Sequence, residues 1–431
     1  MNQNYQIEET PSQIQSTKLW FAFIIVFIII DYGRPQELIK IFAIIRPALL
    51  TTIILAFLVR NFGLINFKIT QLRLIWFFIF LLTALVPFAV NHGIAFKTVT
   101  NFLIIMPFIH SCCACINTID RFKRLMNTSI FLMAYQAIWA ILHSGRGSAG
   151  IFFDENDLAL YINAWLPFCF AMVLASKGLF KRIFFGTLTL IGVGAIVMTF
   201  SRGGFLGLIA MFAVFWLFSP KKLVTLGIAI IGAVVVMYVA SLSSSGKIKH
   251  QKKGSFFTEM DFSSQADNGT GKERIESWKS GWNMFKANPF GVGANNYPVR
   301  FPEYQTDYFK RSMWGRVAHS LWFTLIPETG IIGIIIYLSL IAVNVRDIFK
   351  IKKYSKLLDD ENGPYVRSMS VAFLASLAGF FTSATFLAVL YYPHFWYLSG
   401  YIVALKLITE DMVYTADREQ IDNNGEALYV S

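Results

Sequence analysis

The sequence predicts an all-α, polytopic integral membrane protein, and three features of its composition support that prediction. Of its 431 residues, 55% are apolar and only 15% are charged, whereas about a quarter of the residues of a soluble protein are charged. The apolar residues form runs of about 15 to 22, close to the length that an α-helix needs to cross a bilayer. Most basic residues lie between these runs, so the net charge of +12 reflects membrane topology rather than nucleic-acid binding.

The apolar runs predict about twelve transmembrane helices. A polar and disordered N-terminus is expected at 1–13, helices one to nine within 14–241, helices ten to twelve within 319–409, and a tail at 410–431. The second run is the least regular, because charged residues and a proline interrupt its first half. In chain order, the runs lie at 14–30, 38–59, 71–90, 95–116, 125–142, 158–176, 181–200, 204–219, 221–241, 319–343, 368–390 and 393–409.

The basic residues between the runs predict which side of the membrane each break faces. The breaks after the even-numbered runs hold seventeen Lys and Arg, and the short odd-numbered breaks hold five. Since positive loops stay in the cytoplasm, both termini are expected there. The odd-numbered breaks are then extracytoplasmic: 31–37, 91–95, 144–157, 201–203, 391–394 and the long segment 242–318.

The segment 242–318, between helices nine and ten, is the only candidate for an extramembrane domain. From Lys272 to Ala287 its apolar residues recur at helical spacing, which predicts an amphipathic helix. The pair Asn288-Pro289 ends this helix, and the following GVGANN predicts a tight turn with an unusual backbone. The segment therefore has structure of its own outside the bilayer.

Arg202 is the first candidate for a functional residue. It lies in TFSRGGF, between two apolar runs with almost no loop, and an arginine so close to hydrocarbon is costly and usually has a partner or a function. The alternative is an arginine whose stem lies along apolar surface at the interface. Such arginines occur mostly on the cytoplasmic side, whereas the charge pattern places this one outside, so we expect a function.

The long polar segment carries further arginines, among them Arg274, Arg300 and Arg316. Arg274 falls in the first turn of the amphipathic helix, where exposed amides and the helix dipole favour anions. The alternative is a solvated surface arginine beside Glu273 and Glu276. The position alone does not decide between the two.

His319 stands at the start of the tenth run. A helix N-terminus disfavours imidazolium, so the ring is expected to be neutral and able to accept a proton near neutral pH. The alternative is amphipathic packing at the membrane interface. His319, however, follows the arginine-bearing segment and lies on the same face as Arg202, which favours a catalytic role.

Acidic residues provide three more candidates. The break 144–157 contains Asp154 and Asp157, which could bind a metal or a sugar. Asp157 could instead cap the helix that is expected to begin at Leu158. Glu328 lies inside the tenth run, and a carboxylate within a membrane helix is a functional candidate by default, here without an assigned role.

The four cysteines do not predict a metal site. Cys112, Cys113 and Cys115 form the cluster CCAC at the end of an apolar run, and Cys169 stands alone. Adjacent thiols cannot surround a tetrahedral metal without other ligands at suitable spacing. We expect all four to be small buried residues.

These motifs together resemble the O-antigen ligases and the related Wzy-type polymerases. SRGG at 201–204 is similar to the SRG motif of that superfamily, and the loop pair Arg274 and Trp278, then NPFGVGANNY, then AHSLWFTLIPETGIIG follow in the same order. The resemblance covers about residues 190–340. In addition, DYGRPQE at 31–37, which contains Arg34, and DENDLAL at 154–160 resemble the O-glycosylation ligases associated with exosortase systems.

The resemblance implies a metal-independent, inverting glycosyltransferase that needs no cofactor. Its donor would be a glycan on polyprenyl (undecaprenyl) diphosphate, and its acceptor a hydroxyl of a glycolipid, a polysaccharide or a protein. The enzyme would lie in the bacterial inner membrane with its site facing the periplasm or the cell exterior. In this interpretation His319 is the general base, and Arg202 and Arg274 bind the diphosphate; further candidates are Arg34, Arg300, Arg316, Asp154, Asp157 and Glu328.

Two alternatives remain open. A Wzy-type polymerase would use the same site with a second lipid-linked glycan as acceptor, and nothing in the sequence separates it from a ligase. A transporter of lipid-linked glycans would more typically show inverted repeats and Gly/Pro-broken helices near the bilayer midplane. It would also not need a polar outer segment as long as 242–318.

Overall fold

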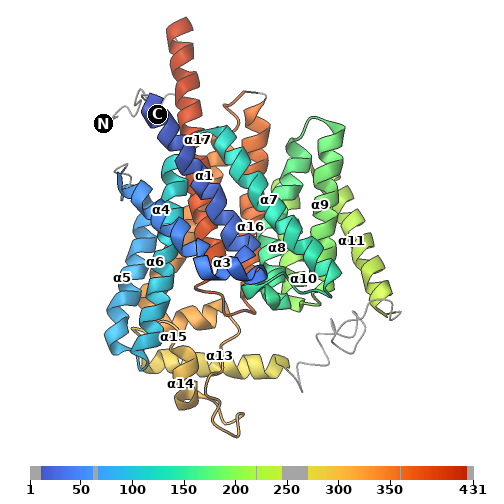
Figure 1. Cartoon of the computed structure of the whole chain (residues 1–431). Coiled ribbons are helices and arrows are strands. Elements are labelled where there is room, and N and C mark those ends of the chain that lie inside the picture. Colours follow the sequence, from blue (N-terminus) through green and yellow to red (C-terminus); the bar gives the residue numbers. More distant parts are fainter. Residues whose placement is uncertain (1–10, 62–66, 220, 245–269, 360, 425–431) are drawn as a thin grey trace.

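The computed structural model describes residues 11–61, 67–219, 221–244, 270–359 and 361–424, and every regular element in these ranges is a helix (Figure 1). The predicted all-α class is confirmed. Parts of the predicted N-terminus, outer segment and tail lie outside the described residues. The helices are α1 (Pro11–Gly33), α2 (Pro35–Leu38), α3 (Lys40–Ile45), α4 (Pro47–Asn61), α5 (Thr70–Leu85), η1 (Val86–Phe88), α6 (His92–Cys115), α7 (Ile119–Leu142), η2 (Gly150–Phe153), α8 (Glu155–Ala175), α9 (Leu179–Met198), α10 (Arg202–Phe218), α11 (Lys222–Ser244), α13 (Thr270–Ala287), α14 (Tyr297–Tyr304), α15 (Leu321–Tyr354), α16 (Asn362–Ala384) and α17 (Pro393–Asn424).

Among the described residues, seven helices are long and apolar enough to cross a membrane. They are α5 continued by η1, α6, α7, α8, α9, α15 and α16, and three shorter apolar helices lie within α4, α10 and α11. The chain is therefore a multi-pass membrane protein, and the number of crossings stays a prediction. The predicted second helix is interrupted, because the backbone of Arg46 is left-handed (φ 49°) between α3 and α4.

The centre of the bundle is α8, of whose apolar stretch 89% is buried. Its sequence is apolar on every side, as expected of a helix surrounded by others. Near its middle, the side-chain NH₂ group of Asn163 donates to the Gly204 carbonyl of α10 at 2.7 Å and to Ser383 Oγ of α16 at 3.0 Å. These bonds fix the start of α10 against the end of α16. All four cysteines are buried, as predicted.

Basic side chains at one end of the bundle bind the carbonyl ends of helices. Arg121 Nη1 donates to the last carbonyl of α6 at 2.9 Å, Lys221 Nζ to the last turn of α8 at 3.0 Å, and Lys352 Nζ to the last carbonyl of α10 at 3.1 Å. These carbonyls have no partner within their helix and carry the negative end of its dipole. The opposite end of the bundle consequently holds the N-termini of α8 and α10.

A separate layer lies across that opposite end. In Figure 1, α13 and α14 lie at the bottom of the molecule, whereas α17 ends at the top. The predicted helix over 272–287 is confirmed as α13. The layer has its own small core, which includes Met284, Tyr297 and Phe301, and Tyr297 donates its hydroxyl proton to the Ser277 carbonyl at 2.6 Å.

This layer is joined to α15 at a break in the helix. α15 contains Pro327 and is interrupted at Gly330 (φ 63°, ψ −166°). The amides of Val292 and Gly293 donate to the carbonyls of Pro327 and Glu328 at 2.9 and 3.0 Å, and the amide that follows the break donates to the Pro289 carbonyl at 2.9 Å. Backbone groups that the break would leave unpaired are thus satisfied by Pro289 and by the GVGANN turn.

Only glycine fits where the two backbones meet. Gly291 and Gly330 both have positive φ, and a Cβ on Gly291 would lie 2.7 Å from the Glu328 carbonyl oxygen. A Cβ on Gly330 would overlap the Pro289 carbonyl. Gly291 of NPFGVG and Gly330 of PETG are thereby explained by one contact, which we call the backbone clasp (residues 289–293 with 327–331).

The orientation in the membrane is tested by reporter fusions. From the charge asymmetry, a phosphatase fused after Gly254 should be active only outside the cytoplasm, and a fluorescent reporter fused after Ser355 should be active only inside. The measurement is enzymatic activity and fluorescence in intact cells. The reverse pattern at either position would place the α13–α14 layer on the cytoplasmic side.

Candidate functional site

Arg202 occupies the first position of α10, at the end of the bundle that faces α13. Ser201 caps the helix, and its Oγ accepts a hydrogen bond from the Gly204 amide at 3.1 Å. Phe386, which follows α16, packs against the backbone of Gly203. Arg202 is half-buried at a helix N-terminus, where free amides and the positive dipole end favour an anion.

Arg274 lies in the opening part of α13, near Arg202. Its side chain is half-buried. Burial is the main cause of a lowered pKa for Arg274, and the positive charge of Arg202 lowers the pKa further, while Asp154 acts against both. The two guanidinium groups therefore repel each other across the site, an arrangement that a bound polyanion would relieve.

His319 lies two residues before the first residue of α15, next to the capping residue Ser320. His319 itself has a left-handed backbone (φ 48°). Trp278 of α13 holds the preceding residue, because its Nε1 donates to the Ala318 carbonyl at 3.0 Å. The backbone of this segment thereby fixes where the imidazole stands.

The charges around His319 favour its neutral form. Burial is the largest cause of a lowered pKa for His319, followed by Arg274 and Arg316; Asp154 and Glu273 partly oppose them. A neutral imidazole can accept a proton at neutral pH. The structure thus brings Arg202, Arg274 and His319 into one electrostatic cluster with Asp154, although they come from distant parts of the chain.

Arg316 belongs to the edge of this cluster. Its Nη2 forms an ion pair with Glu273 at 2.9 Å, its Nε donates to Ser277 Oγ at 2.8 Å, and its guanidinium lies over the Phe309 ring at 4.7 Å. These contacts attach the segment before His319 to α13. Arg316 acts on His319 through its charge and through this attachment.

In the break 144–157, the residue that caps the next helix is not the expected one. Asp154, not Asp157, caps α8: its Oδ1 accepts from the amides of Asn156 and Asp157 at 2.8 and 3.4 Å. The expectation that Asp157 caps a helix beginning at Leu158 is wrong, because α8 begins three residues earlier. Asp157 instead accepts a hydrogen bond from the Tyr392 hydroxyl at 3.2 Å.

Tyr392 connects this acidic group to Arg34. Burial and then Asp157 raise the pKa of the Tyr392 phenol, and Arg34 lowers it. Arg34 Nη1 forms an ion pair with Glu37 Oε1 at 2.9 Å, and both side chains lie next to Gly150. The motifs around 31–37 and 154–160 therefore meet beside the arginine cluster. Tyr392 was not singled out by the sequence; its only signal is its position in an outer break.

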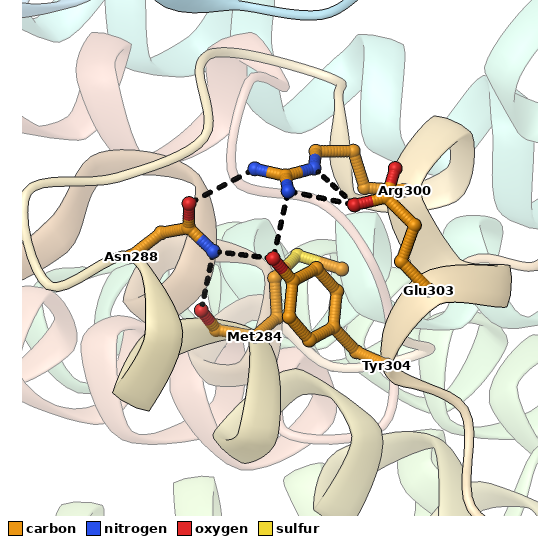
Figure 2. Close-up of polar contacts among 5 residues, drawn as sticks. All are labelled: Met284, Asn288, Arg300, Glu303 and Tyr304. Carbon is orange, nitrogen blue, oxygen red and sulfur yellow. Dashed lines mark hydrogen bonds and ion pairs between the residues drawn. The ribbon is translucent and has the colours of Figure 1, made fainter.

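Arg300 lies in a different environment (Figure 2). Its guanidinium donates to Glu303 at 2.9 and 2.6 Å, to Asn288 Oδ1 at 3.0 Å and to the Tyr304 hydroxyl at 2.7 Å, and Asn288 also donates to that hydroxyl at 2.8 Å. These bonds brace the corner between α13 and α14. Arg300 therefore stabilises this corner, and these contacts do not include Arg202, Arg274 or His319.

Glu328 is the anchor of the backbone clasp. Its Oε2 accepts from the Asn295 amide at 2.8 Å and from the Tyr391 hydroxyl at 2.6 Å, and its Oε1 accepts from the Tyr297 amide at 3.1 Å. Both oxygens are thus occupied by donors from the GVGANN turn, from the first residue of α14 and from the segment before α17. This position gives a physical account of a membrane carboxylate to which the sequence assigned no role.

Replacement of Glu328 by glutamine should destabilise the protein by about 1–3 kcal/mol, because an NH₂ group would face a backbone N–H donor. The midpoint of thermal unfolding in detergent should fall, and the pH profile of kcat should keep its shape. Tyr391→Phe, which removes one bond and leaves the two amides paired, should have a smaller effect. Full stability of Glu328→Gln combined with loss of kcat would assign the carboxylate to catalysis instead.

The comparisons with known proteins bear on this part of the chain. Residues 187–338 match the model of a family described as O-antigen ligase. The match extends from α9 into α15, and so it contains Arg202, Arg274 and His319. A comparison with curated proteins finds none that matches. Over residues 187–338 the chain is therefore similar to the O-antigen ligase family.

Proposed function

We propose that the chain transfers a glycan from a polyprenyl diphosphate carrier to an acceptor hydroxyl at the outer face of the bacterial inner membrane. The observation that carries the proposal is the convergence of Arg202, Arg274 and His319 where the bundle meets the α13–α14 layer. Such a site combines fixed cations with one proton acceptor. Residues 242–318 form the extracytoplasmic part of the enzyme.

The arginines suit the leaving group of this reaction. When the bond between the anomeric carbon and the phosphate oxygen breaks, the electron pair stays on the polyprenyl diphosphate. Arg202 and Arg274 stabilise that charge, since guanidinium groups bind phosphate oxygens in a planar, two-pronged geometry. The N-terminus of α10 adds the positive end of its dipole. This charge stabilisation requires no metal ion.

His319 suits the other half of the reaction. The acceptor oxygen forms its bond to the anomeric carbon on the face opposite to the departing diphosphate, which inverts the configuration. The hydroxyl proton passes to the neutral imidazole as that bond forms. Asp154 then stabilises the imidazolium, because its charge acts on His319 in that direction.

Of the two alternatives, the polymerase agrees with the structure better than the transporter does. A polymerase uses the same arginines and histidine with a lipid-linked glycan as acceptor, so the site supports it equally. A transporter would use a broken helix to line a passage. The break in α15 is filled by the GVGANN turn and by Glu328, which favours a fixed scaffold over a moving gate.

The test is a transfer assay with the natural substrates. A deletion strain should accumulate lipid-linked glycan and lose the corresponding acceptor product, both measured by mass spectrometry. The purified protein in vesicles should then convert the extracted lipid-linked glycan to product with release of polyprenyl diphosphate and inversion at the anomeric carbon. Movement of intact lipid-linked glycan across the vesicle membrane without transfer would support the transporter.

A further inference from the structure

We infer that a groove on the outer layer binds the sugar rings of a glycan chain and forms a subsite beside the transfer site. The groove has a volume of ≈ 500 Å³, within the range of small-molecule sites. It runs along α13 to the first turn of α15. Its walls include Trp278, Lys279, Trp282, Asn283, Thr306 and Phe323.

Aromatic rings form one side of this sugar groove. Trp278 and Phe323 are stacked, with ring centroids 5.3 Å apart and planes at 4°. Trp282, which is 47% exposed, stands one turn further along α13. Its ring centroid lies 5.3 Å from that of Phe285. Flat, rigid aromatic faces suit the C–H faces of pyranose rings, and they bind at a low cost in side-chain entropy.

Polar groups stand beside the aromatic rings. Glu276 accepts from Lys279 and from Thr306 Oγ1, each at 2.8 Å, and the hydrogen bond from Lys279 is the main reason that its pKa is lowered. The side chain of Asn283 makes no hydrogen bond within the described part of the chain. Its amide both donates and accepts, as do the hydroxyl groups of a sugar.

The sugar groove is continuous with the transfer site through Trp278. One edge of that indole donates to the carbonyl of Ala318, next to His319, at 3.0 Å. Its ring also lies 6.4 Å from that of Phe386, which packs on Gly203 beside Arg202. A glycan in the groove thus reaches the histidine without crossing the bundle. The location of the reaction rests on the proposed function, whereas sugar binding does not.

The pattern of side chains favours a glycan over the membrane surface as the occupant. Ile275 and Trp282 are exposed, and a helix lying on a membrane would present them in a continuous apolar stripe. Here Lys279 and Asn283 lie between and beside them in the same groove. Trp314, which is 72% exposed and lies outside the groove, offers a matched control.

The experiment compares Trp282→Ala, Trp282→Phe and Trp314→Ala in the full-length protein. The probes are the glycan released by mild acid from the extracted lipid-linked donor, and the natural acceptor. We expect Trp282→Ala to raise the Kd for the released glycan about ten-fold or more, Trp282→Phe to retain most of the affinity, and Trp314→Ala to bind like wild type. An increase in KM for the donor or for the acceptor, with kcat retained, identifies which glycan the groove holds.

The outcomes separate this inference from the proposed function. Unchanged Kd and KM for Trp282→Ala, or no binding of glycan by wild type, would contradict glycan binding in the groove. Neither result would contradict the proposed transferase activity. If the protein binds glycan through Trp282 but transfers none, the result would support glycan binding in the groove and contradict the proposed function. Quenching of Trp282 by brominated phosphatidylcholine in vesicles would assign that face to the membrane and would also overturn the inference.

Discussion

Replacement of His319 by alanine should lower kcat by about 10²–10⁴-fold, the effect that removal of a general base typically has. Binding of the lipid-linked donor should be retained, because His319→Ala leaves Arg202 and Arg274 in place. The measurement is single-turnover transfer by the purified variant in vesicles, together with its level in the membrane. Transfer within a few-fold of wild type would remove the catalytic role of His319.

A second variant separates catalysis from folding. His319 has a positive φ, which asparagine tolerates better than alanine. His319→Asn should therefore fold with less strain than His319→Ala and yet be equally inactive, because an amide cannot accept the proton. Recovery of activity in His319→Asn would show that the backbone conformation, rather than the imidazole, is what matters.

The pH dependence follows from the same surroundings. The pKa of His319 is lowered by burial and by Arg274 and Arg316, so the active neutral form persists below the ordinary value of about 6.5. The wild-type rate should hold through neutral pH and decline only as pH falls through this lowered pKa. Arg316→Gln removes one lowering charge and should move the acid limb of the profile to higher pH.

The second large effect is expected at Arg202. Arg202→Ala should reduce kcat by about 10²–10³-fold, comparable to the loss of a donor that stabilises charge in a transition state. Arg202→Lys keeps the charge but loses the planar arrangement of donors, so it should recover only part of that loss. Transfer is measured with the same extracted donor, and equal wild-type rates for both variants would exclude a role in binding the diphosphate.

Arg300→Ala provides the matched control. Arg300 lies within the same matched residues 187–338, but its guanidinium is occupied by Glu303, Asn288 and Tyr304. Its loss should lower the midpoint of thermal unfolding and leave kcat per folded molecule close to wild type. A loss of kcat equal to that of Arg202→Ala would contradict the purely structural role assigned to Arg300.

The sequence predicts well what depends on local pattern. Apolar runs and the helical spacing from 272 to 287 predict helices, because burial requires one apolar face or an entirely apolar segment. The order of the motifs around Arg202, Arg274 and His319 predicts that they belong to one site, and the structure brings them together. Their chemical roles remain proposals.

What the sequence could not predict depends on partners far away in the chain. Asp157 stands three residues after the true cap and bonds to Tyr392, 235 positions later. Glu328 looks like a free membrane carboxylate until Asn295, Tyr297 and Tyr391 are placed around it. No periodicity or spacing within either segment encodes these contacts, so both residues could only be identified as candidates.

The backbone clasp has a practical consequence for chimeras made from this protein. Each side of the contact between 289–293 and 327–331 supplies hydrogen-bonding groups that the other lacks, and neither Gly291 nor Gly330 has room for a side chain. An exchange that replaces the α13–α14 layer of this protein should therefore have its junctions outside residues 288–331. A junction at the membrane boundary, near residue 320, would separate the two halves and leave the broken helix open within the bilayer.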